Sequence, residues 1–174
     1  MPVDPGDRLG LPERLDPRHD VMAFDNGRHP ALDDWLKRRA LASEGLSARS
    51  YVICEGANSR RVVGYYSIAT AMEQRLLLPS AKLRRGTPDE IPLLLIARLA
   101  IDQTWRGRGL GSQLLADALH RCLKASDIAG VRGVIVHAID DEAVGFYRKH
   151  GFLASPLGER VLVMPIEYLR SVFR

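Results

Sequence analysis

The residues best suited to chemistry form a glycine-rich segment in the middle of the chain. The segment Arg106-Gly107-Arg108-Gly109-Leu110-Gly111-Ser112 follows an apolar run and opens an amphipathic one. Alternating glycines let successive N–H groups point in one direction at a helix start, where the helix dipole is positive. Such a cradle binds a diphosphate, and Arg106 and Arg108 add positive charge beside it. The ending of a P-loop and the third-glycine spacing of a dinucleotide-binding fingerprint are both missing.

Groups that could move a proton are harder to assign, and no general base stands out. Asp140, Asp141 and Glu142 are candidates, but acids in the first turn of a helix are more often caps. His137 falls on a predicted strand, where a packed histidine is the favoured reading, and His120 is expected on a solvent face. If the reaction consumed an α-amine with a pKa near 8, part of that amine would already be neutral and water could accept its proton.

Hydrophobic patterning predicts the elements that position these residues. The predicted strands are 21–24 (a short edge strand), 50–54, 61–68, 93–101, 131–138 and 161–164. The predicted helices begin at Pro30, at Leu110 and at Asp140, with a short one over 166–173, and residues 73–91 are expected to be irregular. Strand, helix and strand at the centre imply a parallel pair with a right-handed crossover, and the flanking hairpins imply a mixed sheet.

Length and composition favour one soluble domain. We expect residues 1–174 to form it, with residues 1–20 as an extended leading segment. No apolar stretch approaches the roughly 20 residues that span a bilayer, and the N-terminus lacks signal-peptide character. Cys54 and Cys122 form neither a disulfide framework nor a metal-ligand spacing. We therefore expect a cytoplasmic protein that uses no metal and no membrane.

The positive charge is small in total but clustered. The formal net charge is +4, and basic residues gather at 37–39, 60–61, 82–85 and 106–108. Several clusters on one face would attract phosphates more strongly than the net charge suggests. Any single cluster is better read as a solvated surface.

Two motifs resemble the GNAT superfamily of N-acetyltransferases. Arg106-x-x-Gly109-x-Gly111 matches its Q/R-x-x-G-x-G/A signature, and Phe146-Tyr147 with Gly151-Phe152 matches its F-Y-x-x-x-G-F ending. The resemblance implies an α/β fold (α+β in detail) whose mixed, mostly antiparallel sheet has a splayed parallel strand pair and is flanked by helices. It implies acetyl-CoA as cosubstrate and Tyr147 as the acid that protonates the departing thiolate. The coenzyme contacts that it implies are Leu99, Ala100, Ile101, Arg106, Gly107, Arg108, Gly109, Leu110, Gly111, Ser112 and Asp141.

A narrower group is similar over nearly the whole chain after residue 20: the TacT/AtaT-like GNAT toxins of bacterial toxin–antitoxin pairs. The matching segments are Phe24-Asp25-x-Gly27, Leu32-Asp33-Asp34-Trp35-Leu36 with Arg39-Ala40, Val63-Gly64-Tyr65-Tyr66-Ser67, Arg98-Leu99-Ala100-Ile101-Asp102, and Val131-Arg132-Gly133 through Asp140-Asp141-Glu142-Ala143. The resemblance implies acetylation of the α-amine of aminoacyl-tRNA, a homodimer and a ribbon-helix-helix antitoxin.

The expected phosphate contacts under this reading are Lys37, Arg38, Arg49, Lys82, Arg84 and Arg85. Two alternatives stay open on the sequence. In the first, the acetyl group goes to a small amine or a protein N-terminus. In the second, the chain is a non-catalytic module that binds coenzyme or nucleic acid.

Overall fold

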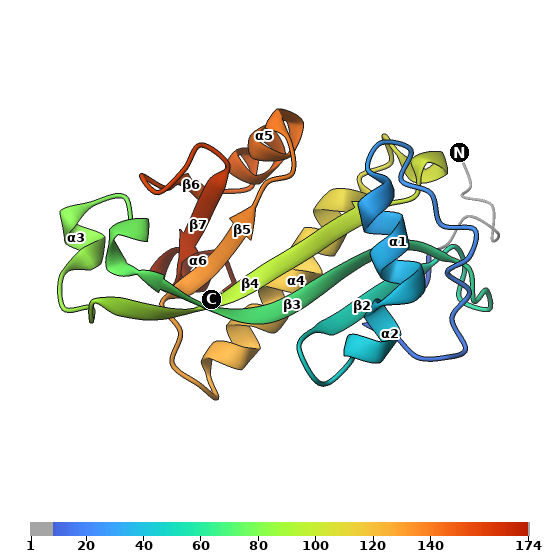
Figure 1. Cartoon of the computed structure of the whole chain (residues 1–174), viewed down its shortest axis with the longest axis horizontal. Coiled ribbons are helices and arrows are strands. Elements are labelled where there is room, and N and C mark those ends of the chain that lie inside the picture. Colours follow the sequence, from blue (N-terminus) through green and yellow to red (C-terminus); the bar gives the residue numbers. More distant parts are fainter. Residues whose placement is uncertain (1–8, 174) are drawn as a thin grey trace. The chain divides into compact units, whose positions relative to one another are not determined.

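A computed structural model describes residues 9–173 (Figure 1). The strands are β1 (Glu13–Arg14), β2 (Arg49–Cys54), β3 (Val62–Gln74), β4 (Glu90–Ile101), β5 (Gly133–His137), β6 (Leu153–Ala154) and β7 (Val161–Pro165). The helices are α1 (Pro30–Arg38), α2 (Ala40–Ser43), α3 (Ala81–Arg84), α4 (Leu110–Ser126), α5 (Asp141–Lys149) and α6 (Ile166–Phe173), with 3₁₀ turns η2 (Arg75–Leu77) and η3 (Gln103–Trp105).

The strands form a mixed sheet, as predicted. Within the described residues the order is β1-β2-β3-β4-β5-β7-β6. The pair β4–β5 is parallel, with Leu94 opposite Val134 and Ile96 opposite Val136. The pairs β1–β2, β2–β3, β5–β7 and β6–β7 are antiparallel. The expected mixed sheet with one parallel pair and flanking helices is therefore confirmed.

The chain divides into two compact units. The first contains the residues up to Ile68 together with Arg98–Asp117, and the second contains Ala69–Ala97 and the residues from Ala118 onward. The strands β3 and β4 and the helix α4 each supply residues to both units. The single domain over 1–174 stays a prediction.

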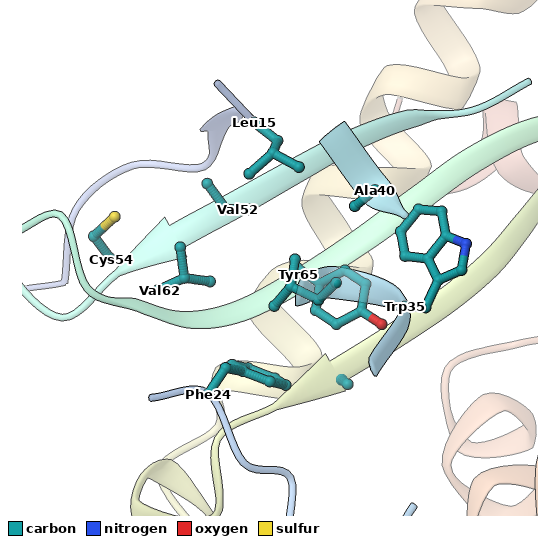
Figure 2. Close-up of a cluster of buried hydrophobic side chains, with 10 residues drawn as sticks. Leu15, Phe24, Trp35, Ala40, Val52, Cys54, Val62 and Tyr65 are labelled. Atoms are coloured by element: carbon teal, nitrogen blue, oxygen red, sulfur yellow. The ribbon is translucent and has the colours of Figure 1, made fainter. Parts of the chain in front are cut away.

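In the first unit, helix α1 packs on the strands through aromatic and aliphatic side chains (Figure 2). The Trp35 ring stacks on the Tyr65 ring at 6.1 Å, and Phe24 meets Tyr65 edge-on at 5.6 Å. Successive strand residues face opposite sides, so Gly64 lies on the other face. There a Cβ on Gly64 would stand 2.7 Å from Leu114 of α4. Glycine at this position lets the start of α4 approach β3 closely.

The second unit has its own core. Its buried members are Leu77, Leu78, Leu83, Ile91, Leu93, Ile135 and Val163. The strands β5 and β7 approach so closely that a Cβ on Gly133 would lie 2.4 Å from the carbonyl oxygen of Met164. Arg132 forms an ion pair with Glu167, which connects α6 to the rest of this unit.

Two predicted elements were wrong. Residues 21–24 form no strand, because the Phe24 N–H bonds the Val21 carbonyl in a turn that buries the Phe24 ring. The edge strand of this unit is instead β1, which pairs with β2. Residues 73–91 are more regular than expected, since they contain the end of β3, η2 and α3.

Of the expected extended segment 1–20, residues 1–8 lie outside the described residues, and Glu13–Arg14 forms β1. None of the helices within residues 9–173 is both long and apolar enough to cross a bilayer.

Candidate active site

The glycine-rich turn is an open loop that begins after β4. Gly107 and Gly109 have φ angles of 73° and 77°, the left-handed region that glycine adopts without strain. No atom lies within 4 Å of a Cβ placed on either residue. The two glycines are therefore used for their backbone conformation, and they leave a free space in front of the turn. That space suits a ligand that needs direct access to backbone N–H groups.

The turn is anchored by a buried carboxylate. Asp102 accepts hydrogen bonds from the backbone N–H of Thr104 at 2.9 Å and from that of Asp25 at 3.1 Å. Its exposed fraction is only 2%. Burial raises the pKa of Asp102, but the hydrogen bonds from Thr104 and Asp25 outweigh it and leave the pKa below its usual value. The carboxylate is thus ionised and ties the 25–29 turn to the turn that carries the glycines.

Arg106 belongs to the same network. Its guanidinium donates to the backbone carbonyl oxygen of Asn26, and the Asn26 amide donates to Asp33 at 2.7 Å. Asn26 is itself buried. In this arrangement Arg106 positions the turn. Arg106 and Arg108 are both exposed, and the Arg108 guanidinium lies over the Trp105 ring at 4.5 Å from its centroid.

The remaining expected coenzyme contacts of the first unit adjoin the turn. Ala100 is buried in the core cluster, whereas its neighbours Leu99 and Ile101 are half-buried. Helix α4 begins at Leu110, and the Gln113 N–H bonds the Gly109 carbonyl. The backbone N–H groups of a first helical turn have no intrahelical acceptor. The end of β4, the glycine turn and the start of α4, which holds Gly111 and Ser112, therefore form one continuous stretch of this unit.

Tyr147 lies on α5 in the second unit. Its ring is 7% exposed and meets the rings of Phe146 and Phe152 edge-on. Burial raises the pKa of the Tyr147 phenol well above its usual value, so the hydroxyl stays protonated at physiological pH. A protonated phenol is the form that can donate a proton to a leaving group.

The acidic residues at the start of α5 have structural partners. Asp140 caps the helix, accepting the Ala143 N–H at 2.8 Å, as the helix-cap reading predicts. Asp141 is almost fully exposed and pairs with Arg160 at 3.3 Å. His137 is exposed, so the reading of it as a packed core histidine was wrong, and His120 is exposed as predicted.

The six basic residues expected to contact phosphate are divided between the units. Lys37, Arg38 and Arg49 are in the first, and Lys82, Arg84 and Arg85 are in the second. Arg49 pairs with Glu44 at 3.5 Å, and the Nε of Arg84 donates to the Leu78 carbonyl at 2.8 Å. Arg38, Lys82 and Arg85 are exposed.

Sequence reasoning missed a pocket of about 570 Å³ in the first unit. Its lining residues are Ala31, Leu32, Asp34, Trp35, Arg38, Arg39 and Arg98. The Arg98 guanidinium lies 4.0 Å from the centroid of the Trp35 ring. The available signal was Arg98 itself, a lone charge in the apolar run 93–101.

A second cluster in the first unit has metal-binding residue types. The ligand atoms of Glu13, His19 and Cys54 lie within 4.8 Å of one another. However, Nδ1 of His19 accepts the Asp16 backbone N–H, so Nε2 carries the proton and donates it to Glu13 at 2.7 Å. Burial, with the nearby charge of Glu13, raises the pKa of the Cys54 thiol to about 11. This hydrogen bonding suits a structural contact between β1 and β2.

Comparison with known proteins decides the family. The profile of the family described as an acetyltransferase (GNAT) domain matches residues 47–153. The chain belongs to the GNAT acetyltransferases. The tRNA-acetylating toxin of Mycobacterium tuberculosis is 40% identical over 162 residues, which cover 92% of this chain and 95% of that toxin.

Solved structures of AtaT share the fold. AtaT complexed with acetyl-methionyl-tRNAfMet is 30% identical with a TM-score of 0.88, covering 96% of this chain and 100% of AtaT. A tyrosine-to-phenylalanine mutant of AtaT, bound to acetyl-CoA and the C-terminus of the antitoxin AtaR, is 28% identical with a TM-score of 0.78. That match covers 96% of this chain and 99% of the AtaT chain. The expected acetyltransferase family and its toxin branch are confirmed.

Proposed function

We propose that this GNAT acetyltransferase is a toxin that transfers acetyl from acetyl-CoA to the α-amine of aminoacyl-tRNA. The observation that carries the proposal is the open glycine turn at Gly107 and Gly109, on a chain 40% identical to a tRNA-acetylating toxin. Acetylating the α-amine removes the nucleophile that forms the peptide bond. The product therefore cannot accept a growing peptide, and translation stops.

The coenzyme site is proposed along the first unit. Backbone N–H groups from Gly107 to Ser112 bind the diphosphate, helped by the exposed Arg108. The backbone of Leu99 and Ile101 pairs with the pantetheine arm as a neighbouring strand would, and an N–H there polarises the thioester carbonyl. Arg106 supports this site indirectly, because its guanidinium holds Asn26. Asp141, which belongs to the second unit, remains a proposed contact of the coenzyme.

Tyr147 is proposed as the general acid. Bound acetyl-CoA supplies the thioester, whose carbonyl carbon forms a bond to the amine nitrogen as its bond to sulfur breaks. The Tyr147 hydroxyl gives its proton to the departing thiolate, and water takes the proton that the amine loses. Burial raises the pKa of Tyr147, so the hydroxyl carries its proton when the reaction begins.

The acceptor and the partners follow from the relatives. Lys37, Arg38 and Arg49 in one unit and Lys82, Arg84 and Arg85 in the other are proposed phosphate contacts. Among them Arg38, Lys82 and Arg85 are the most available, because Arg49 and Arg84 already have partners. We also propose a homodimer in the cytoplasm that is neutralised by a ribbon-helix-helix antitoxin.

Transfer of radiolabelled acetyl from acetyl-CoA into purified aminoacyl-tRNA tests the function. Wild-type protein should label charged tRNA, and should leave uncharged tRNA and polyamines unlabelled. Tyr147→Phe should lower kcat by about 100-fold or more, since general acid catalysis contributes that order of rate. Its acetyl-CoA affinity should be unchanged, because the phenol acts on the leaving group.

Two results would count against the proposal. Labelling of polyamines in preference to charged tRNA would show that the acceptor is a small amine and not aminoacyl-tRNA. Undiminished turnover by Tyr147→Phe would remove Tyr147 from the chemistry.

A further inference from the structure

The pocket beside α1 contains an arginine that lies against a tryptophan ring, and this pair forms its floor. The Arg98 guanidinium lies 4.0 Å from the Trp35 ring centroid, and Trp35 stacks on Tyr65 with an interplanar angle of 12°. The Tyr65 hydroxyl donates to the Leu32 carbonyl of α1 at 2.6 Å. The Arg98 guanidinium therefore lies against a tryptophan ring that is itself held by Tyr65. The arginine is therefore preorganised, which lowers the entropy lost when it binds a ligand.

The pocket is positively charged. Arg38, Arg39 and Arg98 line it, and Asp34 is the one acid among its lining residues. Among residues 9–173 no carboxylate pairs with any of these three guanidinium groups. Four other arginines of the same unit are paired: Arg14 and Arg49 with Glu44, Arg18 with Asp16, and Arg61 with Glu55. Unpaired charges gathered at one concave site indicate an anionic ligand.

The chemistry of the lining favours a phosphodiester strand. Guanidinium groups bind phosphate oxygens through paired N–H donors, and a stacked arginine also offers a flat surface to a base. A volume of about 570 Å³ accommodates single-stranded nucleotides, whereas a double helix is too wide for it. In an aminoacyl-tRNA the amine sits at the end of such a single strand.

We propose that this pocket, with Arg98 on Trp35 as its floor, binds the phosphodiester backbone of the single-stranded 3′ end of the acceptor tRNA. The inference rests on the proposed function, because that function supplies the RNA. It adds Arg39 and Arg98 to the substrate contacts and gives Arg38 a defined site. Phosphates of the tRNA body would meet other basic residues.

A binding cycle with uncharged tRNA tests the inference without any acetyl transfer. Fluorescence anisotropy would measure the affinity of intact tRNA and of the same tRNA lacking its single-stranded 3′ end. Trimming should weaken binding to wild-type protein. Arg98→Gln and the double variant Arg38→Gln with Arg39→Gln should each weaken binding of intact tRNA by about five- to tenfold, the scale of charge-assisted contacts. They should bind trimmed tRNA as wild-type protein does.

Salt dependence gives a second readout. Each lost phosphate contact should reduce the slope of log affinity against log salt by about 0.7. The matched control is Arg60→Gln, which removes an exposed arginine of the same unit outside the pocket. It should leave the ratio between intact and trimmed tRNA unchanged. Arg98→Lys keeps the charge and should recover part of the affinity.

The outcomes separate the two proposals. Equal weakening of intact and trimmed tRNA, or no weakening by either pocket variant, overturns the pocket assignment. Loss of acetyl-CoA affinity in a folded Arg98→Gln protein also overturns it, since the pocket would then serve the coenzyme. If Arg98→Gln fails to fold, the tRNA affinity of the double variant at the exposed Arg38 and Arg39 decides whether the pocket binds the 3′ end. Absence of acetyl transfer by wild-type protein refutes the proposed function alone.

Discussion

Two arginine–tryptophan pairs lie in the first unit, and they are built in opposite ways. Arg98 covers Trp35 at 4.0 Å, and Arg108 covers Trp105 at 4.5 Å. Trp35 is buried on a regular helix and stacks on Tyr65. Trp105 is half-buried in a 3₁₀ turn, and Arg108 stands between two glycines with positive φ. Packing fixes the first pair, whereas backbone geometry and hydrogen bonds fix the second.

The contrast fits the two kinds of ligand proposed. A pocket that presents side-chain guanidinium groups needs them held by a rigid floor, which a hydrophobic core supplies. A cradle that presents backbone N–H groups needs an open path to the main chain, which side chains would block. Substitutions at the Arg98–Trp35 pocket should therefore lower both the stability of the fold and ligand binding, whereas substitutions at the glycine turn should affect binding with a smaller loss of stability.

The largest expected difference is in stability. Trp35→Ala should lower the free energy of unfolding by about 3–5 kcal/mol, because it leaves a cavity under α1. Trp105→Ala should cost about 1 kcal/mol or less, because it removes a half-buried ring and one exposed cation–π contact. Urea denaturation of both variants measures this difference. Equal losses would show that the glycine turn is packed as firmly as α1.

A smaller loss is expected where hydrogen bonds replace packing. Asp102→Asn should cost about 1–3 kcal/mol, because an amide nitrogen would face the Asp25 N–H and leave a buried donor unpaired. Asp89→Asn, at a carboxylate 90% exposed, is the matched control and should change stability by less than about 0.5 kcal/mol.

The effect of Asp102 should depend on pH in a defined direction. Its pKa is lowered in the folded protein, so the charge stabilises the fold above the unfolded pKa of about 3.9. That contribution is lost as pH falls through the folded value. The stability gap between wild type and Asp102→Asn should therefore narrow in acid. If this difference in the free energy of unfolding stayed constant down to acidic pH, the destabilisation by Asp102→Asn would come from the shape of the side chain and not from its charge.

The sequence predicted the glycine turn of the second region but not the carboxylate that anchors it, and it did not predict the pocket of the first region. The glycine spacing of residues 107–111 is local, so the turn was predictable before any tertiary contact was known. The Arg98–Trp35 pocket joins residues 63 positions apart, and its formation depends on α1 crossing the strands. Asp102 was missed for the same reason, since its partner Asp25 is 77 residues away. Strand 21–24 failed because short apolar runs do not distinguish a strand from a buried turn.

A pair of glycine substitutions gives the sharpest test of the cradle. Gly107→Ala and Gly86→Ala place the same methyl group on backbones of nearly equal φ, 73° and 74°, with no atom within 4 Å of either Cβ. Each should cost about 1–2 kcal/mol, the strain of a left-handed residue. Only Gly107→Ala should also weaken acetyl-CoA binding, by about tenfold, because its methyl enters the space in front of the proposed diphosphate site.

Calorimetry with both folded variants measures the two affinities under one set of conditions. Since the backbone strain is matched, any difference in affinity reports the ligand and not the fold. Equal acetyl-CoA affinity in the two variants would mean that the coenzyme does not approach the main chain at Gly107. The glycine turn would then be a folding device, and the contrast between the two arginine–tryptophan pairs would lose its functional meaning.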